Sequence, residues 1–504
     1  MFTKLNSAAP NGLDCVPVDV EVDVNKGQTN FTIIGLGDTS IKEARERVYS
    51  AMKNSGFDYP YNFRILINLA PADLNKEGPM YDLPMAVGLV AVSQDLDLQL
   101  NDAMLVGELA LDGSLRHTNG ILPLTIFAKD SGLQRIFVPA VNAAEAGLVE
   151  GIAIYPVNNL KQIMEHFTGV ALITPYERKT VDYSFGDRSY ELDMSMIKGQ
   201  EFAKRALEIA ASGNHNLLMS GPPGSGKTLL ARTTPSILPR LSFAESLEIT
   251  KIYSIAGILT GNLISERPFR SPHHSASAAS LVGGSRIPRP GEISLAHRGV
   301  LYLDELPEFP RAILESLRQP LEDGVVTIAR AKGTITFPAR FILIASKNPC
   351  PCGYASDPER ACTCATGQVL SYKRKISGPL MDRIDLCVEV PRLHFDKLSD
   401  NTLAESSAII RERVEAARDI QNNRFKKSRV KTNGEMGNKE LKEHCQLDTA
   451  TMELLKNAAT KLCLSARGYS RILKISRTIA DLAQSDKIQL EHLAEALQYR
   501  PKTE

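Results

Sequence analysis

Residues 221–228 form the group with the clearest chemical meaning. They follow the apolar run Leu217–Met219 and precede the apolar run Leu229–Ala231. The eight residues are Gly221, Pro222, Pro223, Gly224, Ser225, Gly226, Lys227 and Thr228. A strand that leads through a glycine-rich loop into a helix is typical of a phosphate-binding loop, where backbone N–H groups and the helix N-terminus face the phosphates. Lys227 would then neutralise the β- and γ-phosphates of ATP, and Thr228 would ligate Mg²⁺.

Two further apolar runs end in polar side chains that suit the same chemistry. Val300–Leu303 leads into Asp304 and Glu305. Asp304 would hold Mg²⁺ and Glu305 would polarise the attacking water. The run Phe341–Ala345 leads to Asn348, whose amide could orient that water. Taken alone, the two acids could cap a surface turn and the asparagine could belong to a turn; downstream of a phosphate-binding loop, the catalytic interpretation is favoured.

Four cysteines cluster shortly after Asn348. They are Cys350, Cys352, Cys362 and Cys364. Two closely spaced thiol pairs could surround one tetrahedral Zn²⁺, and a four-sulfur site leaves no position for a reactive water. The expected role is therefore structural, with reduced free thiols as the alternative.

The amino-acid composition is that of an ordinary globular protein. The chain has 504 residues, which suggests about three or four domains. Its 59 basic and 58 acidic side chains nearly balance, so any nucleic-acid surface must be local. No apolar run is long enough to span a membrane and none resembles a signal peptide, so we expect a cytoplasmic protein. Eight cysteines in that compartment argue against disulfides.

The pattern along the chain predicts an α/β multi-domain protein. Residues 1–168 read as an α+β domain, with a helix capped by Ser40 and Glu43. Residues 169–195 read as a linker, and residues 196–392 alternate strands and helices as in a covered parallel sheet. Residues 393–504 form a helical lid. Its expected helices cover 401–422, 439–464, 469–485 and 489–499.

A predicted β-hairpin lies between the two catalytic strands. Val325–Arg330 and Thr334–Phe337 flank a basic tip that includes Lys332. Arg330 and Lys332 could touch a polyanion backbone, although a solvated tip explains them as well. The neighbouring His273 and His274 would point to opposite sides of an extended segment, which argues against a shared metal.

With these motifs in place, the chain resembles the magnesium-chelatase-like AAA+ ATPases of the YifB/ComM type over nearly its entire length. The characteristic stretches are 291–305, 348–353, 377–385, 464–469 and 477–482. The resemblance implies that Arg383 is an arginine finger for a neighbouring subunit and that Arg467 is a sensor arginine of the chain's own lid. Lys375 stands where similar sequences often have arginine, so no catalytic role is expected of it.

The same resemblance implies a homo-oligomeric ring, expected to be a hexamer, because no single subunit owns a complete site. In related rings the hairpin points into the pore. The implied activity is an ATP-driven DNA translocase or branch-migration helicase acting on single-stranded or branched DNA, in recombination or natural transformation. The alternative is a chelatase-like or chaperone-like ATPase that remodels a protein partner, which the sequence does not identify.

The first domain resembles the Lon-type proteolytic fold. The matching stretches are 76–80, 106–109, 113–115 and 136–142. Where that family has its nucleophilic serine this chain has Met80, and where it has its lysine base this chain has Ala128. A thioether and a methyl group can neither attack a carbonyl nor accept a proton, so we expect an inactive scaffold or partner-binding domain.

Overall fold

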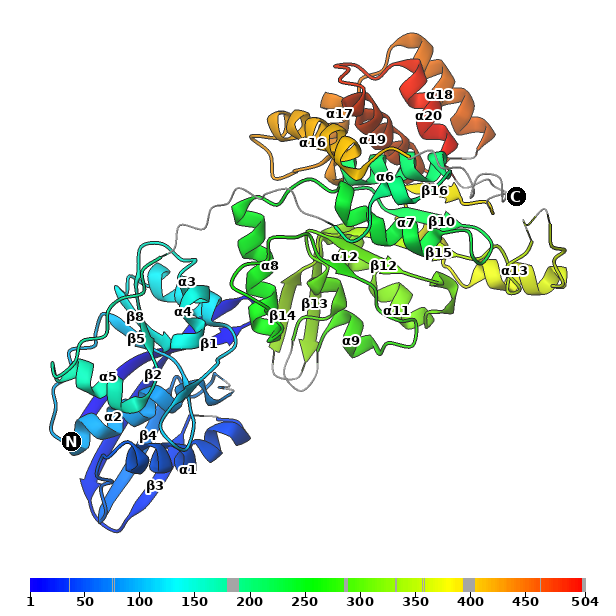
Figure 1. Ribbon diagram of the computed structural model, residues 1–504. Helices are drawn as coiled ribbons and strands as arrows, with labels where there is room; N and C mark the ends of the chain where they lie inside the picture. The colour runs from blue at the N-terminus through cyan, green and yellow to red at the C-terminus, as the bar shows by residue number, and fades with distance from the viewer. Residues whose placement is uncertain are drawn as a thin grey trace. The chain divides into compact units, whose positions relative to one another are not determined.

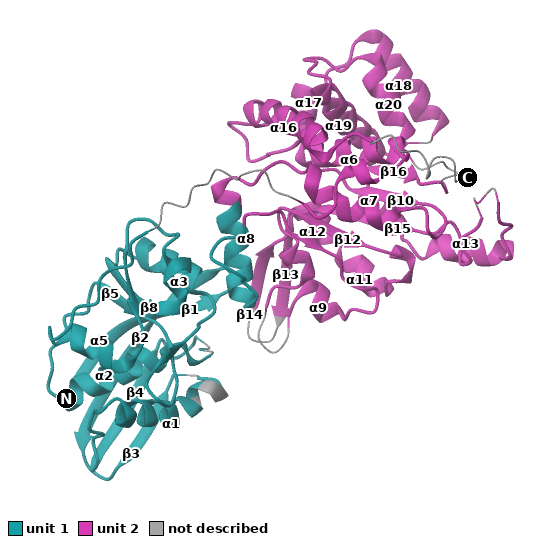
Figure 2. Ribbon diagram, viewed as in Figure 1, with its two compact units in different colours: residues 1–183, 246–264 teal, residues 184–245, 265–504 magenta. Residues whose placement is uncertain are grey.

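The computed structural model describes residues 1–35, 37–74, 76, 78–178, 190–284, 289–330, 333–355, 357, 359–392, 404–462 and 464–500, with the backbone alone for residues 39, 40, 42, 330 and 333. The chain divides into two compact units, coloured separately in Figure 2. Unit 1 contains residues 1–183 and 246–264, and unit 2 contains residues 184–245 and 265–504.

Within the described part of unit 1, seven strands form one mixed sheet in the order β3-β4-β2-β1-β5-β8-β9 (Figure 1). The strands are β1 (Phe2–Asn11), β2 (Asp14–Lys26), β3 (Asn30–Ile34), β4 (Phe63–Ala70), β5 (Ala103–Leu105), β8 (Arg135–Pro139) and β9 (Ala153–Val157). β2 runs antiparallel to β1 and β4, and the remaining neighbours are parallel. Alternate residues of β2 are buried from Val18 to Val24, as period-two packing on a sheet face requires.

Helices of unit 1 pack on this sheet. They are α1 (Thr39–Asn54), α2 (Asp82–Ser93), α3 (Ile121–Asp130), α4 (Ala143–Ala146) and α5 (Leu160–Phe167), with the short pair β6 (Glu108–Leu109) and β7 (Leu115–Arg116). The predicted cap of α1 at Ser40 is wrong by two residues. Asp38 is the N-cap, and its carboxylate accepts a hydrogen bond from the Ile41 N–H at 3.0 Å. Aspartate and serine are comparable caps, so the sequence pattern did not distinguish them.

A segment from within the nucleotide-site region of the sequence belongs to unit 1. Helix α8 (Phe243–Ala256) begins in unit 2, and its residues from Ser246 onward are part of unit 1. The Ser254 hydroxyl donates to the buried Glu145 carboxylate at 2.6 Å, and Leu247 and Leu263 pack against the core of unit 1. The chain therefore leaves unit 2 and returns to it between the phosphate-binding loop and Asp304.

In unit 2, the described residues form a five-stranded parallel sheet in the order β11-β12-β15-β10-β16. The strands are β10 (Leu217–Ser220), β11 (Phe269–Arg270), β12 (Val300–Leu303), β15 (Ile342–Lys347) and β16 (Leu386–Glu389). The parallel sheet expected for this region is confirmed. β12 is buried at every residue, as expected for a strand covered on both faces.

Helices and one hairpin surround this sheet. The helices are α6 (Glu201–Gly213), α7 (Lys227–Thr233), α9 (Ala278–Val282), α10 (Glu292–Leu295), α11 (Arg311–Ser316), α12 (Arg318–Asp323), α13 (Thr366–Arg374) and α14 (Gly378–Met381). The expected hairpin is present as β13 (Val325–Arg330) and β14 (Gly333–Pro338), which pair antiparallel from Val325↔Pro338 to Arg330↔Gly333.

The C-terminal region is helical, as expected, and shares a buried hydrophobic cluster with the sheet of unit 2. Its helices are α16 (Ser407–Arg424), α17 (Asn438–His444), α18 (Thr449–Lys461), α19 (Ala466–Leu482) and α20 (Leu490–Gln498). The single helix expected over 439–464 is wrong, because it is two helices. Asp448 interrupts it by accepting a hydrogen bond from the Thr451 N–H at 2.8 Å, which caps α18.

Across the described residues, no helix combines the length and the apolar character that crossing a membrane would require.

Candidate nucleotide site and cysteine cluster

The glycine-rich loop connects β10 to α7 at the carboxyl edge of the parallel sheet. Gly221 passes so close to the next strand that an added Cβ would lie 2.1 Å from the Val390 carbonyl oxygen, so only glycine fits. Gly226 precedes α7 with a φ of +91°, a conformation that favours glycine, and an added Cβ there would meet no atom within 4 Å. The loop thus keeps an open face before the helix N-terminus, as phosphate binding requires.

Lys227 lies under this loop. Its ammonium group donates to the carbonyl oxygens of Gly221 at 2.7 Å and Pro222 at 2.8 Å, and lies 3.4 Å from Asn348 Oδ1. Burial lowers the pKa of Lys227, and the charges of Asp304 and Glu305 oppose that effect. The structure thus brings together the predicted lysine and the predicted asparagine, although they are far apart in sequence.

Asp304 lies opposite the first turn of α7. The Thr228 hydroxyl donates to Asp304 Oδ2 at 2.9 Å, and the Ser346 hydroxyl donates to Asp304 Oδ1. Burial alone would raise the pKa of Asp304, but hydrogen bonds from Ser346, Thr228 and Tyr302 outweigh it, so the pKa lies below its ordinary value. A hydroxyl beside an ionised carboxylate offers the hard oxygen ligands that Mg²⁺ prefers.

Glu305 follows with a φ of +53°, a left-handed conformation just after β12, and its side chain is half exposed. Its N–H donates to Ser346 Oγ and to Asp304 Oδ1, each at 3.1 Å. Its carboxylate lies 3.9 Å from His274 Nδ1. The rings of His273 and His274 lie 4.0 Å apart, so the expectation that they point to opposite sides is wrong. That expectation assumed an ideal strand, and these residues follow the short strand β11 in a loop.

The two predicted arginines lie beside each other. Arg383 follows α14, and Arg467 lies in the first turn of α19. Both bind one carboxylate of α12, because Arg383 Nη2 pairs with Glu322 Oε2 and Arg467 Nη2 lies 3.4 Å from Glu322 Oε1. Arg383 Nη1 also donates to the Pro379 carbonyl oxygen at 2.8 Å.

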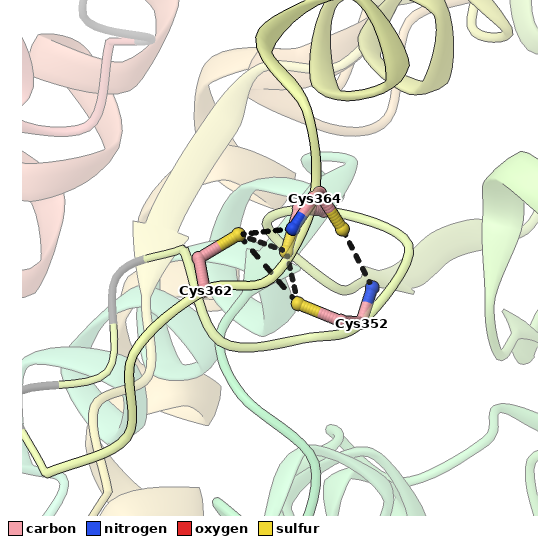
Figure 3. A group of neighbouring side chains, drawn as sticks. Cys352, Cys362 and Cys364 are labelled. Atoms are coloured by element: carbon pink, nitrogen blue, oxygen red, sulfur yellow. Dashed lines mark hydrogen bonds between the residues drawn. The ribbon is translucent and has the colours of Figure 1, made fainter.

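The four predicted cysteines converge in the loop between β15 and α13. Their sulfur atoms all lie within 4.8 Å of one another. Cys350 Sγ lies 3.3 Å from Cys352 Sγ and 3.6 Å from Cys362 Sγ, and the last two sulfurs are 3.6 Å apart. Figure 3 shows Cys352, Cys362 and Cys364 directed toward a common centre. Backbone hydrogen bonds, led by that of Tyr354, lower the pKa of Cys352 to about 5.

This arrangement fits a tetrahedral metal site. With Zn–S distances of about 2.3 Å, a tetrahedron separates its sulfurs by about 3.8 Å, close to the spacing found here. The loop also contacts the nucleotide site, because an added Cβ at Gly353 would lie 2.6 Å from Pro223 Cδ. The cluster is therefore compatible with a structural zinc ion that supports the segment after Asn348.

The remaining predicted residues lie elsewhere. Lys332 falls outside the described residues, and Arg330 is described by its backbone only, at the end of β13. In unit 1, Met80 lies in a short 3-10 turn before α2 and Ala128 lies in α3, and both are buried.

Some residues of this site were missed in the sequence. Ser346 lies one position beyond the run that ends at Ala345, and the register Leu303↔Ala345 places it beside Asp304. Aligning the ends of the two apolar runs could have found it, because parallel strands end at the same sheet edge. No sequence pattern around Glu322 indicates its role, because its partners Arg383 and Arg467 lie in two distant segments of the chain.

Comparison with known proteins agrees with this geometry. The chain matches three family descriptions: "Magnesium chelatase, subunit ChlI" over residues 193–398, "Subunit ChlI of Mg-chelatase" over residues 20–142, and "Magnesium chelatase, subunit ChlI C-terminal" over residues 404–500. It is 44% identical to the uncharacterized protein YifB of Escherichia coli, with 98% of this chain and 96% of the relative covered. It is 43% identical to the competence protein ComM of Haemophilus influenzae, with the same coverage. The Magnesium-chelatase 67 kDa subunit of Heliobacterium mobile is 26% identical over 45% of this chain and 38% of its own length. The chain belongs to the magnesium-chelatase-like YifB/ComM family, whose AAA+ character implies an ATPase.

Proposed function

We propose that this protein is an ATP-hydrolysing ring motor that moves on DNA. The observation that carries the ATPase part is the convergence of Lys227, Thr228, Asp304 and Asn348 at one edge of the sheet, although they follow three separate strands, β10, β12 and β15. The DNA part is supported by the similarity to a competence protein along nearly the whole chain.

Each residue of the site has a role in this proposal. Gly221–Gly226 would cradle the phosphates with backbone N–H groups, and Lys227 would neutralise the β- and γ-phosphates. Thr228 and Asp304 would hold Mg²⁺, which stabilises the developing negative charge. Glu305 would take the proton of the attacking water, and Asn348 would orient that water. Ser346 would fix Asp304 and the Glu305 backbone in place.

The proposed roles of the two arginines involve more than one subunit. Arg383 would reach the γ-phosphate of a nucleotide bound by a neighbour, and Arg467 would assist at the phosphates. A site completed by a second copy requires a closed ring, which we expect to be a hexamer. The hairpin β13–β14 would then present Arg330 and Lys332 to single-stranded or branched DNA in the pore. A cytoplasmic location follows, because the motor needs both ATP and DNA.

ATP turnover with and without forked DNA tests this proposal. A DNA motor should hydrolyse ATP faster with forked DNA and should lose that stimulation as salt rises, since phosphate contacts are salt-dependent. Lys227→Ala is the matched control and should abolish both activities. Turnover that ignores single-stranded and forked DNA alike would contradict the DNA part and leave the ATPase part standing.

A second candidate is an ATPase that remodels a protein partner. It is favoured by the similarity to magnesium-chelatase subunits over part of the chain. The two candidates differ in the stimulating partner, because a remodelling ATPase should respond to its protein partner and remain indifferent to DNA.

The cysteine cluster would hold one structural Zn²⁺ per chain. All four ligands would be sulfur, so no position stays open for chemistry on the metal. The contact of Gly353 with Pro223 suggests that the metal loop supports the phosphate-binding loop.

For residues 1–168 we propose a Lon-like scaffold without protease activity. The buried Met80 and Ala128 would occupy its former catalytic positions, and neither can act as nucleophile or base.

A further inference from the structure

Glu322 lies at the junction of three elements of unit 2. It belongs to α12, and its two carboxylate oxygens bind Arg383 after α14 and Arg467 at the start of α19. A second contact joins the same segments, because Arg318 Nη2 of α12 lies 3.3 Å from the hydroxyl of Ser377, the N-cap of α14. Two guanidinium groups are thus held close together by one negative charge.

Arg383 and Arg467 together form a binding site for an anion, and in this structure the Glu322 carboxylate occupies it. A guanidinium fork matches carboxylate and phosphate equally well in shape, and a phosphate carries more charge. Arg383 is also not saturated, since its Nε is buried and finds no acceptor among the described residues. The guanidinium therefore has donors left for a further oxygen.

The exposure of these side chains would allow another anion to replace the Glu322 carboxylate. Glu322 and Arg467 have more than half of their side-chain surface exposed, at 52% and 57%, whereas Arg383 keeps 14%. Exposed ion pairs contribute little to stability because water and salt screen them. Breaking the Arg467–Glu322 pair therefore costs little, whereas the mostly buried Arg383 guanidinium needs another anion when Glu322 leaves.

We propose that Glu322 is a stand-in anion: it occupies the Arg383–Arg467 pair in the isolated subunit, and a phosphate of the neighbouring subunit's nucleotide replaces it when the ring forms. This inference rests on the proposed ATPase ring. It also means that Arg467 acts on the neighbour's nucleotide together with Arg383, which differs from the role of a sensor for its own subunit's nucleotide that the family resemblance implies. Glu322 would thereby oppose assembly of complete sites until nucleotide is present.

Steady-state ATP turnover against protein concentration tests this in the full chain. Glu322→Gln removes the competing charge and keeps the shape, so half-maximal turnover should need roughly two- to twentyfold less protein, the range for losing two exposed ion pairs. The maximal rate should stay the same. Glu405→Gln is the matched control, because Glu405 pairs with the exposed Arg413 elsewhere in unit 2.

Arg383→Ala should hydrolyse ATP slowly, and adding Glu322→Gln should cause no shift in the protein concentration that gives half of this residual turnover. A lower maximal rate in Glu322→Gln would overturn the proposal, because it would make Glu322 a residue that positions the arginines. An unchanged concentration dependence, or an equal shift in Glu405→Gln, would overturn it as well.

A binding measurement separates this inference from the proposed function. Calorimetry with inorganic tripolyphosphate on Lys227→Ala protein reports anion binding away from the phosphate-binding loop and needs no hydrolysis. Adding Glu322→Gln should raise the affinity for tripolyphosphate roughly two- to twentyfold. Adding Arg383→Ala as well should remove this increase in affinity. Equal affinity with and without Glu322 would refute the stand-in role even if the protein hydrolyses ATP as proposed.

Discussion

At the scale of single residues, the proposed site assigns nucleotide binding and hydrolysis to different side chains. The Lys227 ammonium group donates to the loop carbonyls, whereas the Glu305 carboxylate is half exposed. Lys227 can contribute positive charge and hydrogen bonds to the phosphates, and Glu305 can contribute a base. Their substitutions should therefore fail in different ways.

We expect Lys227→Ala to lose ATP binding and Glu305→Gln to bind ATP but hydrolyse it about a hundredfold more slowly or worse, because only the base is removed. Equilibrium binding of a fluorescent ATP analogue and turnover of ATP distinguish the two. Near-normal turnover in Glu305→Gln would exclude Glu305 as the base.

Ser346 gives a second prediction at this scale. Its hydroxyl helps to hold the pKa of Asp304 below the ordinary value. Ser346→Ala should raise that pKa, so Mg²⁺-dependent turnover should begin to fall at a higher pH than in the parent chain. The Mg²⁺ requirement near neutral pH should rise about tenfold, as expected for losing a hydrogen bond to a charged group.

Mg²⁺ titrations across pH measure both effects. Ser476→Ala is the control, since that buried hydroxyl donates to the Ile472 carbonyl within α19. If the fall of turnover at low pH occurs at the same pH in Ser346→Ala as in the parent chain, the proposed effect of the Ser346–Asp304 hydrogen bond is wrong.

At the scale of secondary-structure elements, the sequence predicted best where a pattern is local. The strands β10, β12 and β15 were visible as apolar runs, and the hairpin β13–β14 as two runs around a turn. The start of α1 and the break before α18 were missed, because several polar residues could cap each helix and only the fold selects one. The meeting of Arg383 with Arg467 was not predictable, since it depends on how two distant segments pack.

The cysteine loop is an element whose stability should depend on metal. Protein purified without chelator should contain about one zinc per chain, and changing Cys352 and Cys362 to serine should remove it and lower the melting temperature, because metal binding contributes folding free energy. Elemental analysis and thermal unfolding measure this. Cys15→Ser should leave the metal content unchanged, since burial raises the pKa of that isolated thiol to about 12. If all four clustered cysteines react freely with a thiol reagent in the folded protein, they are reduced thiols that hold no metal.

At the scale of the whole molecule, the proposed role of Arg383 as a finger requires a second subunit. Mixing Arg383→Ala subunits with Glu305→Gln subunits should restore part of the activity, because the first kind keeps the base and the second kind supplies the finger. Arg383→Ala mixed with a subunit carrying both substitutions is the control and should stay inactive. Activity no higher than the two separate preparations would argue against a site shared between subunits.

In the proposed ring, the contact with DNA is the property that depends most on the hairpin. The strands β13 and β14 pair as far as Arg330↔Gly333. Lys332 lies between these strands in the sequence, and the whole segment lies between Asp304 and Asn348. If DNA passes the hairpin tip, Lys332→Ala should weaken binding to all DNA sequences alike and reduce the salt dependence, because phosphate contacts carry charge and no base information. ATP turnover without DNA should persist, since Lys332 has no role at the nucleotide.

Fluorescence anisotropy at several salt concentrations measures the binding, and strand displacement of forked DNA measures the movement. Lys161→Ala is the matched control, because that lysine is exposed on α5 of unit 1, away from the hairpin in the sequence. A Lys332→Ala protein that keeps full DNA-stimulated turnover and normal strand displacement would remove the hairpin from the track. Since the nucleotide chemistry would be untouched, that result would favour a protein partner as the target of the motor.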